Sequence, residues 1–260
     1  MPAILCDIEG TLYSADTLVP GAVEAIAELR ALGCPLRFVS NIDSRTEGDV
    51  LTRLRGRGFD IRDGELFLPA TAAREFLTGQ ADVAVLAVAS EEVRRSFEPF
   101  AAGQAVTHVI VGDCREVLSY AVLDEAFRAL EAGAVLLALQ RGRYLIAEDG
   151  LHLDTGAIVA ALEYASGQTA LVLGKPSPEF GELAAASLGL PAGERPAGVL
   201  WVVGDDATSD VAMGRAIGAI TVQLRTGKYT GQATERSIHP ATHEINSIAE
   251  LPALIRSRSA

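Results

Sequence analysis

The chain has 260 residues, of which 49% are hydrophobic, and a formal net charge of −12 at neutral pH. This length suits one large domain or two of ordinary size. The acidic charge argues against nucleic acid and anionic membranes as partners, because both bind clustered lysine and arginine. We expect neither a membrane span nor a signal peptide. No apolar run approaches about 18 residues, and the N-terminus has no basic segment before a long hydrophobic stretch.

Short apolar runs alternate with helical periods along the chain, which is typical of a parallel sheet with crossover helices. The pattern predicts buried strands at residues 3–6, 36–39, 170–173, 199–203 and 218–224. Helices are predicted after the turn at residues 20–21, around residues 50–54, at residues 178–188 and at residues 248–255.

The middle of the chain continues this alternation as a self-contained stretch. Residues 77–168 contain predicted strands at 83–88, 108–111, 135–138 and 144–147, and predicted helices around 120–130 and 158–165. We therefore predict an α/β protein in two domains. Residues 1–76 and 169–260 would form a discontinuous, three-layer α/β/α Rossmann-like core domain with a parallel sheet, and residues 77–168 an inserted α/β domain.

The three cysteines are isolated from one another in the sequence. Cys6, Cys34 and Cys114 form no CxxC pair, and an odd, sparse set argues against a disulfide framework or a structural zinc site. We therefore expect free, buried thiols in a reducing compartment, and a cytoplasmic protein.

Polar side chains gather at the ends of four predicted strands. They are Asp7, Ser40 with Asn41, Lys175, and Asp205 with Asp206. Ligands of open α/β sheets bind beyond the carboxyl ends of the strands. These four strand ends are therefore expected to converge, although they lie far apart in the sequence.

This set of residue types suits phosphoryl transfer, which depends mainly on positioning and on neutralising charge. Asp7, Glu9 and Asp205 offer hard oxygen ligands of the kind that Mg²⁺ prefers. Lys175, one of only two lysines in the chain, adds a positive charge that can balance phosphate oxygens. The hydroxyl and amide that follow the second strand can donate hydrogen bonds to the same oxygens.

Four stretches resemble the motifs of haloacid dehalogenase-like phosphatases, in the order in which that family carries them. They are residues 7–12 (Asp-Ile-Glu-Gly-Thr-Leu), Ser40-Asn41, Lys175-Pro176, and Gly204-Asp205-Asp206 with Asp210. Together they span nearly the whole chain. The insertion at residues 77–168 resembles the α/β C2-type cap of one subclass, which implies a cap over the active face of the core.

Within that subclass, the chain resembles the group that contains phospholysine phosphohistidine inorganic pyrophosphate phosphatase and its hydrolase-domain-containing relatives. Residues 37–41, 160–165 and 225–229 carry this narrower similarity. The resemblance implies a phosphatase that requires Mg²⁺ as its cofactor.

The resemblance also implies a role for each matching residue. Asp7 would attack phosphorus and form an aspartyl-phosphate, which water then hydrolyses. Glu9 would act as general acid and base through its side chain. The metal ligands would be Asp7, the backbone carbonyl of Glu9, and Asp205.

The remaining matched residues would bind phosphate or support the metal site. The phosphate-binding set would be Gly10, Thr11, Ser40, Asn41 and Lys175. Asp210 would orient the lysine, and Asp206 would support the metal ligands without contacting the metal directly.

Glu9 departs from the family pattern, in which aspartate is usual at this position. Glutamate keeps a carboxylate that can exchange protons, but its extra methylene moves that group toward the substrate. A misplacement of about 1 Å can cost on the order of a hundredfold in rate. We therefore expect an active enzyme with a reduced rate or a narrow substrate range. The alternative is a catalytically impaired protein that binds phosphate or metal.

Three other classes of protein fit less well. A receiver-like signalling domain also has an acidic pocket and a lysine, but it has no inserted cap. A nicotinamide-binding enzyme would carry Gly-x-Gly-x-x-Gly after the first strand, where this chain has Asp-x-Glu-Gly. A metal-free dehalogenase would not need the acidic cluster.

The leading interpretation is hydrolysis of a small phosphorylated compound or pyrophosphate. The expected partner is therefore a small-molecule substrate, with no nucleic acid and no membrane. The family resemblance also suggests a homodimer.

Overall fold

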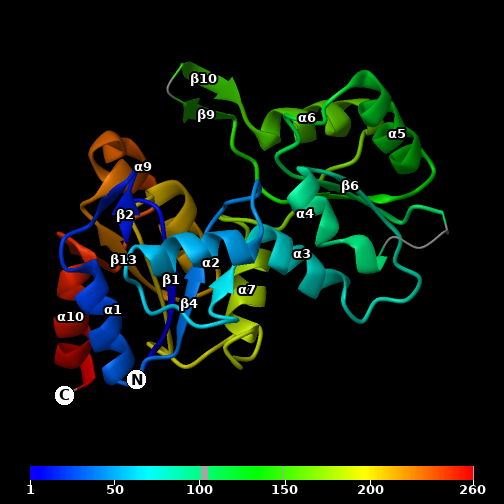
Figure 1. Cartoon of the computed structure of the whole chain (residues 1–260). Coiled ribbons are helices and arrows are strands. Elements are labelled where there is room, and N and C mark those ends of the chain that lie inside the picture. The colour runs from blue at the N-terminus through cyan, green and yellow to red at the C-terminus, as the bar shows by residue number, and fades with distance from the viewer. Residues whose placement is uncertain (101–104, 148, 260) are drawn as a thin grey trace. The chain divides into compact units, whose positions relative to one another are not determined.

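The computed structural model describes residues 1–100, 105–147 and 149–259, which form two compact units (Figure 1). The core unit consists of Met1–Ser40, Val50–Phe67 and Lys175–Ala260, and the insert unit of Asn41–Asp49 and Leu68–Gly174. The insert unit is larger than the predicted 77–168. It also takes in helix α3 (Pro69–Leu77), residues 169–174 and residues 41–49, which include the first turn of the helix that starts at Glu47.

The core unit is built on one parallel sheet with the strand order β14-β13-β12-β1-β4-β5. Its strands are β1 (Ala3–Asp7), β4 (Leu36–Val39), β5 (Leu66–Phe67), β12 (Leu200–Gly204), β13 (Ile220–Leu224) and β14 (His243–Ile245). Every neighbouring pair of strands in this sheet is parallel. The predicted α/β Rossmann-like fold with a parallel sheet is therefore confirmed.

Helices precede or follow the strands of the core sheet along the chain. They are α1 (Ala22–Ala31), α2 (Glu47–Gly56), α7 (Pro178–Ala186), α8 (Ala212–Ala216), α9 (Ala233–Ile238) and α10 (Leu251–Ser259). Helix α1 packs against α10, and α7 packs against α8. A short antiparallel hairpin, β2 (Tyr13–Ser14) with β3 (Thr17–Leu18), follows β1.

Strand β1 is central in the sheet, and all five of its residues are buried. A parallel strand covered on both faces carries a continuous apolar run, and residues 3–6 are such a run. The carboxylate of Asp7 comes at the end of this run, where the strand leaves the core. The sequence thus places a buried charge at the carboxyl edge of the sheet.

The insert unit has its own parallel sheet, with the order β11-β8-β7-β6. The strands are β6 (Val85–Val88), β7 (His108–Val111), β8 (Val135–Ala138) and β11 (Leu171–Val172). Helices α5 (Tyr120–Glu131) and α6 (Thr155–Ser166) pack against each other. The unit also contains α4 (Glu91–Arg95) and an antiparallel hairpin of β9 (Tyr144–Ala147) and β10 (Gly150–Leu153).

The strand predicted at residues 170–173 is present, but its predicted place in the core sheet is wrong. The apolar run at 170–173 forms β11, which pairs with β8 and so belongs to the insert sheet. An apolar run shows that a strand is buried, but it does not show which sheet the strand joins. In the described part of the chain, no helix is both long and apolar enough to cross a bilayer.

Candidate active site

Three strand ends of the core sheet carry buried polar residues. Asp7 ends β1 and lies in register with Val39 of β4, which Ser40 follows directly. On the other side of β1, strand β12 runs parallel to it and leads into Asp205. Asp7, Ser40 and Asp205 are 5%, 5% and 2% exposed, so each polar group is held inside the protein at one edge of the sheet.

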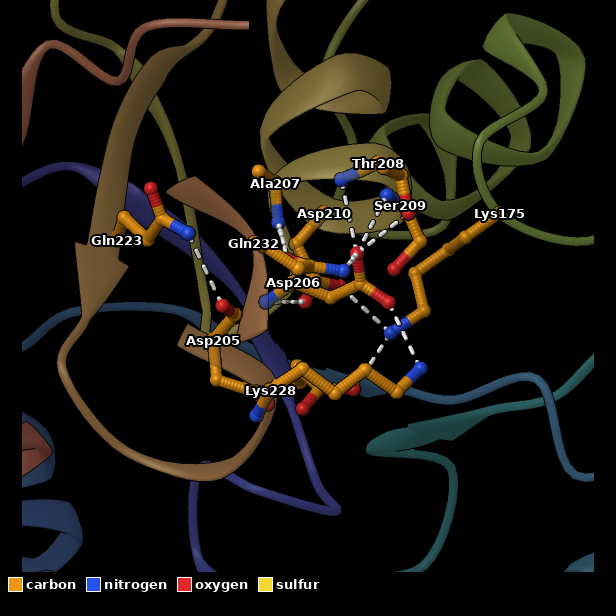
Figure 2. A network of polar contacts seen from close by, with 11 residues as sticks. Lys175, Asp205, Asp206, Ala207, Thr208, Ser209, Asp210, Gln223, Lys228 and Gln232 are labelled. Carbon is orange, nitrogen blue, oxygen red and sulfur yellow. Dashed lines mark hydrogen bonds and ion pairs between the residues drawn. The ribbon is translucent and has the colours of Figure 1, made fainter. Parts of the chain in front are cut away.

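Lys175 connects two of the carboxylates at this edge. Its Nζ lies 2.5 Å from Oδ1 of Asp7. The same Nζ lies 2.7 Å from Oδ1 of Asp210 (Figure 2). Burial opposes the charge on this ammonium, but the carboxylates of Asp210 and Asp7 outweigh burial and raise the pKa of Lys175. The lysine is therefore a fixed positive charge at neutral pH.

The acidic groups outnumber this lysine. Asp7, Asp205 and Asp210 each offer a carboxylate oxygen, and these oxygens all lie within 4.8 Å of one another. Burial and the nearby Asp7 raise the pKa of Asp205 to about 7, and the same two causes raise the pKa of Asp210 well above its ordinary value. The cluster therefore lacks positive charge.

These residues fit a divalent cation. Oδ2 of Asp7 is buried and has no hydrogen-bond partner within the described residues. Carboxylate oxygens are the ligands that Mg²⁺ prefers, and a cation among three carboxylates would relieve their mutual repulsion. The excess of negative charge among three clustered carboxylates therefore fits a divalent cation such as Mg²⁺.

The loop after β1 lies against Asp205. Gly10 has φ +85°, and a Cβ built on it would lie 2.3 Å from Oδ2 of Asp205, so only glycine fits there. The next residue, Thr11, is fully buried, and its hydroxyl has no hydrogen-bond partner in the parts of the chain that the structure describes. Within the described residues, this loop thus holds the hydroxyl of Thr11 without a hydrogen-bond partner, one residue after the point where the Gly10 backbone comes close to the Asp205 carboxylate.

Asp206 is held by a different set of bonds from those of its neighbour Asp205. Its Oδ1 accepts hydrogen bonds from the amides of Thr208 and Ser209 and from Nε2 of Gln232, and its Oδ2 pairs with Nζ of Lys228 at 2.7 Å (Figure 2). Although burial opposes its ionisation, these partners lower the pKa of Asp206. Asp206 is a fixed anion that anchors the π-helical turn Ala207–Val211.

Two predicted site residues are not part of the cluster that the core unit forms. Glu9 is exposed and contributes no oxygen to the group formed by Asp7, Asp205 and Asp210. Asn41 belongs to the insert unit, whereas the neighbouring Ser40 belongs to the core unit. The structure therefore gathers Asp7, Gly10, Thr11, Ser40, Lys175, Asp205, Asp206 and Asp210 within the core unit.

The segment after β13 contributes contacts that the sequence did not reveal. The hydroxyl of Thr226 donates to the carbonyl of Gly10, and the amide of Lys228 donates to Oδ2 of Asp205. Lys228 is the second of the chain's two lysines and lies in the family-like stretch 225–229, but the sequence analysis predicts no site role for it. A hydrogen bond from a backbone amide leaves no mark on residue type, so only the rarity of lysine and the family-like stretch 225–229 pointed to this segment.

A parallel α/β sheet with buried carboxylates and one lysine at its carboxyl edge suits an enzyme that binds an anionic substrate beside a cation. Two family models match the chain. "Haloacid dehalogenase-like hydrolase" covers residues 4–101, and "HAD-hydrolase-like" covers residues 172–251.

Individual proteins agree with these models. Haloacid dehalogenase-like hydrolase domain-containing protein 2 from Bos taurus is 36% identical over 243 residues, covering 94% of this chain and 91% of the relative. Phospholysine phosphohistidine inorganic pyrophosphate phosphatase from Homo sapiens is 33% identical over 253 residues, covering 95% and 91%. The solved structure of p-nitrophenyl phosphatase from Archaeoglobus fulgidus has a TM-score of 0.87 at 27% identity, covering 97% and 98%.

The chain belongs to the haloacid dehalogenase-like hydrolase family. The predicted resemblance to this family is thereby confirmed, including the narrower group to which these relatives belong. The predicted enzyme class, a phosphatase of this family, is confirmed as well.

Proposed function

We propose that this protein is a Mg²⁺-dependent phosphatase that hydrolyses a small phosphorylated compound or pyrophosphate through an aspartyl-phosphate on Asp7. One observation carries the proposal. The buried carboxylate of Asp7 has Oδ1 held by Lys175 at 2.5 Å, while its Oδ2 has no hydrogen-bond partner in the described part of the chain. A carboxylate held in this way has one oxygen free to act as a nucleophile.

The first half-reaction transfers the phosphoryl group to the protein. Oδ2 of Asp7 forms a bond to phosphorus while the bond from phosphorus to the leaving oxygen breaks, and Glu9 gives that oxygen a proton. Glu9 is exposed, so its carboxylate can exchange protons with solvent between turnovers.

The second half-reaction returns the protein to its starting state. Water attacks phosphorus as Glu9 accepts one of its protons, and the bond between phosphorus and Asp7 breaks. Inorganic phosphate leaves, the Asp7 carboxylate is restored, and Glu9 is again protonated.

The other site residues bind and position the phosphoryl group. The hydroxyls of Thr11 and Ser40 and the amide of Asn41 would donate to its oxygens, and Gly10 lets the backbone approach closely. Lys175 balances the negative charge that these oxygens carry. Asp210 holds Lys175 in place through the 2.7 Å contact with its ammonium.

Mg²⁺ would be held by carboxylate oxygens of Asp7 and Asp205 and by the backbone carbonyl of Glu9. When bound, it supplies the positive charge that the acidic cluster lacks and neutralises phosphate oxygens. Asp206 supports this site through its bonds to the turn that follows β12.

The relatives support the substrate class. One is named for phospholysine, phosphohistidine and pyrophosphate, and another for p-nitrophenyl phosphate. Residues 77–168 would act as a cap that selects the substrate and excludes water. The proposal includes a cytoplasmic location, consistent with three free, buried cysteines, and assembly as a homodimer. The alternative of an impaired binding protein depended on Glu9 alone, and no observation supports it.

A phosphate-release screen tests the proposal. Sugar phosphates, nucleotides, pyrophosphate, phosphoramidates and p-nitrophenyl phosphate are incubated with the wild type, with and without Mg²⁺, and Asp7→Asn serves as the inactive control. We expect Mg²⁺-dependent release from at least one compound and none from the control. Release from no compound, or equal release by Asp7→Asn, would contradict the proposal.

A further inference from the structure

The segment Thr226–Lys228, directly beyond β13, contacts three parts of the candidate site. The hydroxyl of Thr226 donates to the carbonyl of Gly10 at 2.5 Å. The amide of Lys228 donates to Oδ2 of Asp205 at 2.7 Å, and its ammonium pairs with Oδ2 of Asp206 at 2.7 Å (Figure 2). Three consecutive residues thus reach both the phosphate loop and the carboxylates after β12.

Gly227 lies at the tightest point of this segment. A Cβ built on it would lie 2.1 Å from Oδ2 of Asp205 and 2.8 Å from Cα of Gly10, and its φ is +51°. Any side chain here must displace either the Asp205 carboxylate or the phosphate loop. Gly10 meets the same carboxylate, since its own Cβ would lie 2.3 Å from Oδ2 of Asp205. Two glycines therefore enclose one oxygen of Asp205.

We propose that Thr226–Lys228 is a positioning element of the metal site, which holds Asp205 and the Gly10 loop in the geometry that binds a divalent cation. The inference rests on the proposed function, because it assigns a purpose to the carboxylate cluster described above. It adds three residues that none of the four family-like motifs contains. These residues act through Asp205 and Gly10 and do not touch the substrate.

The segment would act by restricting the rotation of the Asp205 carboxylate. A carboxylate that binds a metal through one oxygen turns freely unless a neighbour fixes its other oxygen, and partners of this kind commonly set metal affinity. In this protein the Lys228 amide binds Oδ2 of Asp205, while Nε2 of Gln223 donates to the backbone carbonyl of the same aspartate at 3.1 Å. Asp205 is thus held at its backbone and at one side-chain oxygen.

A glycine series separates this role from ordinary backbone strain. In Gly227→Ala the new methyl group meets Asp205. Gly218→Ala places alanine at φ +69° with no atom within 4 Å, so it reproduces the strain without the contact. Gly231→Ala changes a glycine at the other end of the same short 3₁₀ segment, again with nothing within 4 Å.

Mg²⁺ affinity is measured by titration calorimetry without substrate. We expect Gly227→Ala to raise the dissociation constant for Mg²⁺ by about tenfold or more. Both control variants should bind Mg²⁺ within about twofold of the wild type, with Gly218→Ala alone showing a lower melting temperature from strain. Equal Mg²⁺ affinity in all three variants would overturn the inference.

A second pair of variants decides the matter if Gly227→Ala does not fold. Thr226→Val removes the hydroxyl that binds Gly10 but keeps the shape, and Thr226→Ser keeps the hydroxyl. We expect Thr226→Val to need about fivefold to tenfold more Mg²⁺ for half-maximal rate, because one hydrogen bond contributes on the order of 1 kcal/mol. Thr226→Ser should restore the wild-type requirement, and KM for substrate at saturating Mg²⁺ should stay unchanged in both.

The outcomes distinguish this inference from the proposed function. If the wild type neither binds Mg²⁺ nor releases phosphate, the proposed function fails. If the wild type does both while Thr226→Val matches Thr226→Ser in Mg²⁺ requirement, only the positioning role fails. A raised KM at saturating Mg²⁺ in Thr226→Val would also overturn it, because the segment would then act on the substrate.

Discussion

Nζ of Lys175 lies 2.5 Å from Oδ1 of Asp7, although 168 residues separate them in the sequence. The same nitrogen lies 2.7 Å from Oδ1 of Asp210, so one buried ammonium pairs with two of three clustered carboxylates. A buried group with excess negative charge is unfavourable on its own. The folded protein therefore carries an electrostatic cost that a bound cation reduces.

The variant Asp7→Asn should lose activity and gain stability. It removes the proposed nucleophile, so phosphate release should fall to background. It also removes one of three mutually repelling carboxylates, so the melting temperature in metal-free buffer should rise by a few degrees, about 2–4 °C per kcal/mol for a chain of this size. Calorimetry and a phosphate assay check both effects.

The matched control is Asp63→Asn, whose carboxylate is 91% exposed and which should change neither the melting temperature nor the rate of phosphate release. A lower melting temperature for Asp7→Asn would contradict this account of the cluster.

The variant Lys175→Met should have the opposite effect on stability. It leaves the carboxylates of Asp7 and Asp210 without their shared ammonium partner, and removal of one partner from a buried ion pair costs about 3–5 kcal/mol. We expect a loss of activity of at least about a hundredfold as well. Added Mg²⁺ should recover part of the lost stability, because it binds the folded state.

A double variant provides the check on this interpretation of Lys175. In Lys175→Met with Asp7→Asn, one charge of each sign is removed together, so the combined loss of stability should be smaller than that of Lys175→Met alone. Chemical denaturation of the wild type, both single variants and the double variant measures this coupling. Strict additivity would mean that the two side chains do not interact in solution.

The variant Glu9→Gln should be sensitive to the leaving group. A carboxamide cannot donate the proton that a poor leaving group needs, so kcat/KM for an alkyl phosphate, which reports the first half-reaction, should fall on the order of a hundredfold or more. A phenolate such as that of p-nitrophenyl phosphate leaves without much help, so its first step should fall much less. The kcat/KM values on the two substrates provide the comparison, with Glu91→Gln, a surface change on helix α4, as the control. Equal losses on both substrates would refute a proton-transfer role in the first step.

Much of the fold could be predicted from apolar periodicity. Continuous apolar runs marked β1, β4 and β12, because strands covered on both faces need them. The short strand β14 (His243–Ile245) lies at the sheet edge with half-exposed residues, so it left no such run. The sequence could not show that β11 belongs to the insert sheet either. That depends on its pairing with β8, and pairing partners are set by tertiary contacts.

The candidate site could be predicted only where residue type carries the chemistry. Asp7, Lys175 and Asp205 combine opposite charges at strand ends, a pattern that is visible in sequence. The contribution of Lys228 comes from its backbone amide, which every residue except proline has. The narrow space at Gly227 depends on the position of Asp205, which lies beyond a different strand. Neither feature has a local sequence signature.

The insert unit contains a buried acid whose ionisation should make stability depend on pH. Asp43 is 6% exposed, and its Oδ2 accepts a 2.6 Å hydrogen bond from the hydroxyl of Thr155. Burial is the main cause that raises the pKa of Asp43 to about 7, and the nearby carboxylates of Asp154 and Asp113 add to it. The folded protein therefore holds a proton on Asp43 at pH values where the unfolded chain has released it.

The sign of the effect follows from this difference in bound protons. Between about pH 4 and pH 7 the folded state binds more protons than the unfolded state, so stability falls as pH rises, and above about pH 7 the loss is complete. The variant Asp43→Asn has no ionisable group at this position, so it does not lose this stability as the pH rises. Its stability relative to the wild type should therefore increase from pH 4 to pH 7, by about 1.4 kcal/mol for each unit of pKa shift, and then stay constant.

Denaturation of wild type and Asp43→Asn at several pH values measures this difference. Glu65→Gln is a control, because the pKa of Glu65 is shifted in the opposite direction to that of Asp43. Arg30 binds both oxygens of Glu65, at 2.6 and 2.8 Å, and outweighs burial to lower the pKa of that carboxyl. Glu65→Gln should thus be less stable than the wild type at neutral pH, with the difference vanishing as the pH falls below the pKa of the folded state. A difference between Asp43→Asn and the wild type that is constant from pH 4 to pH 8 would mean that Asp43 is ionised throughout this range in the folded protein.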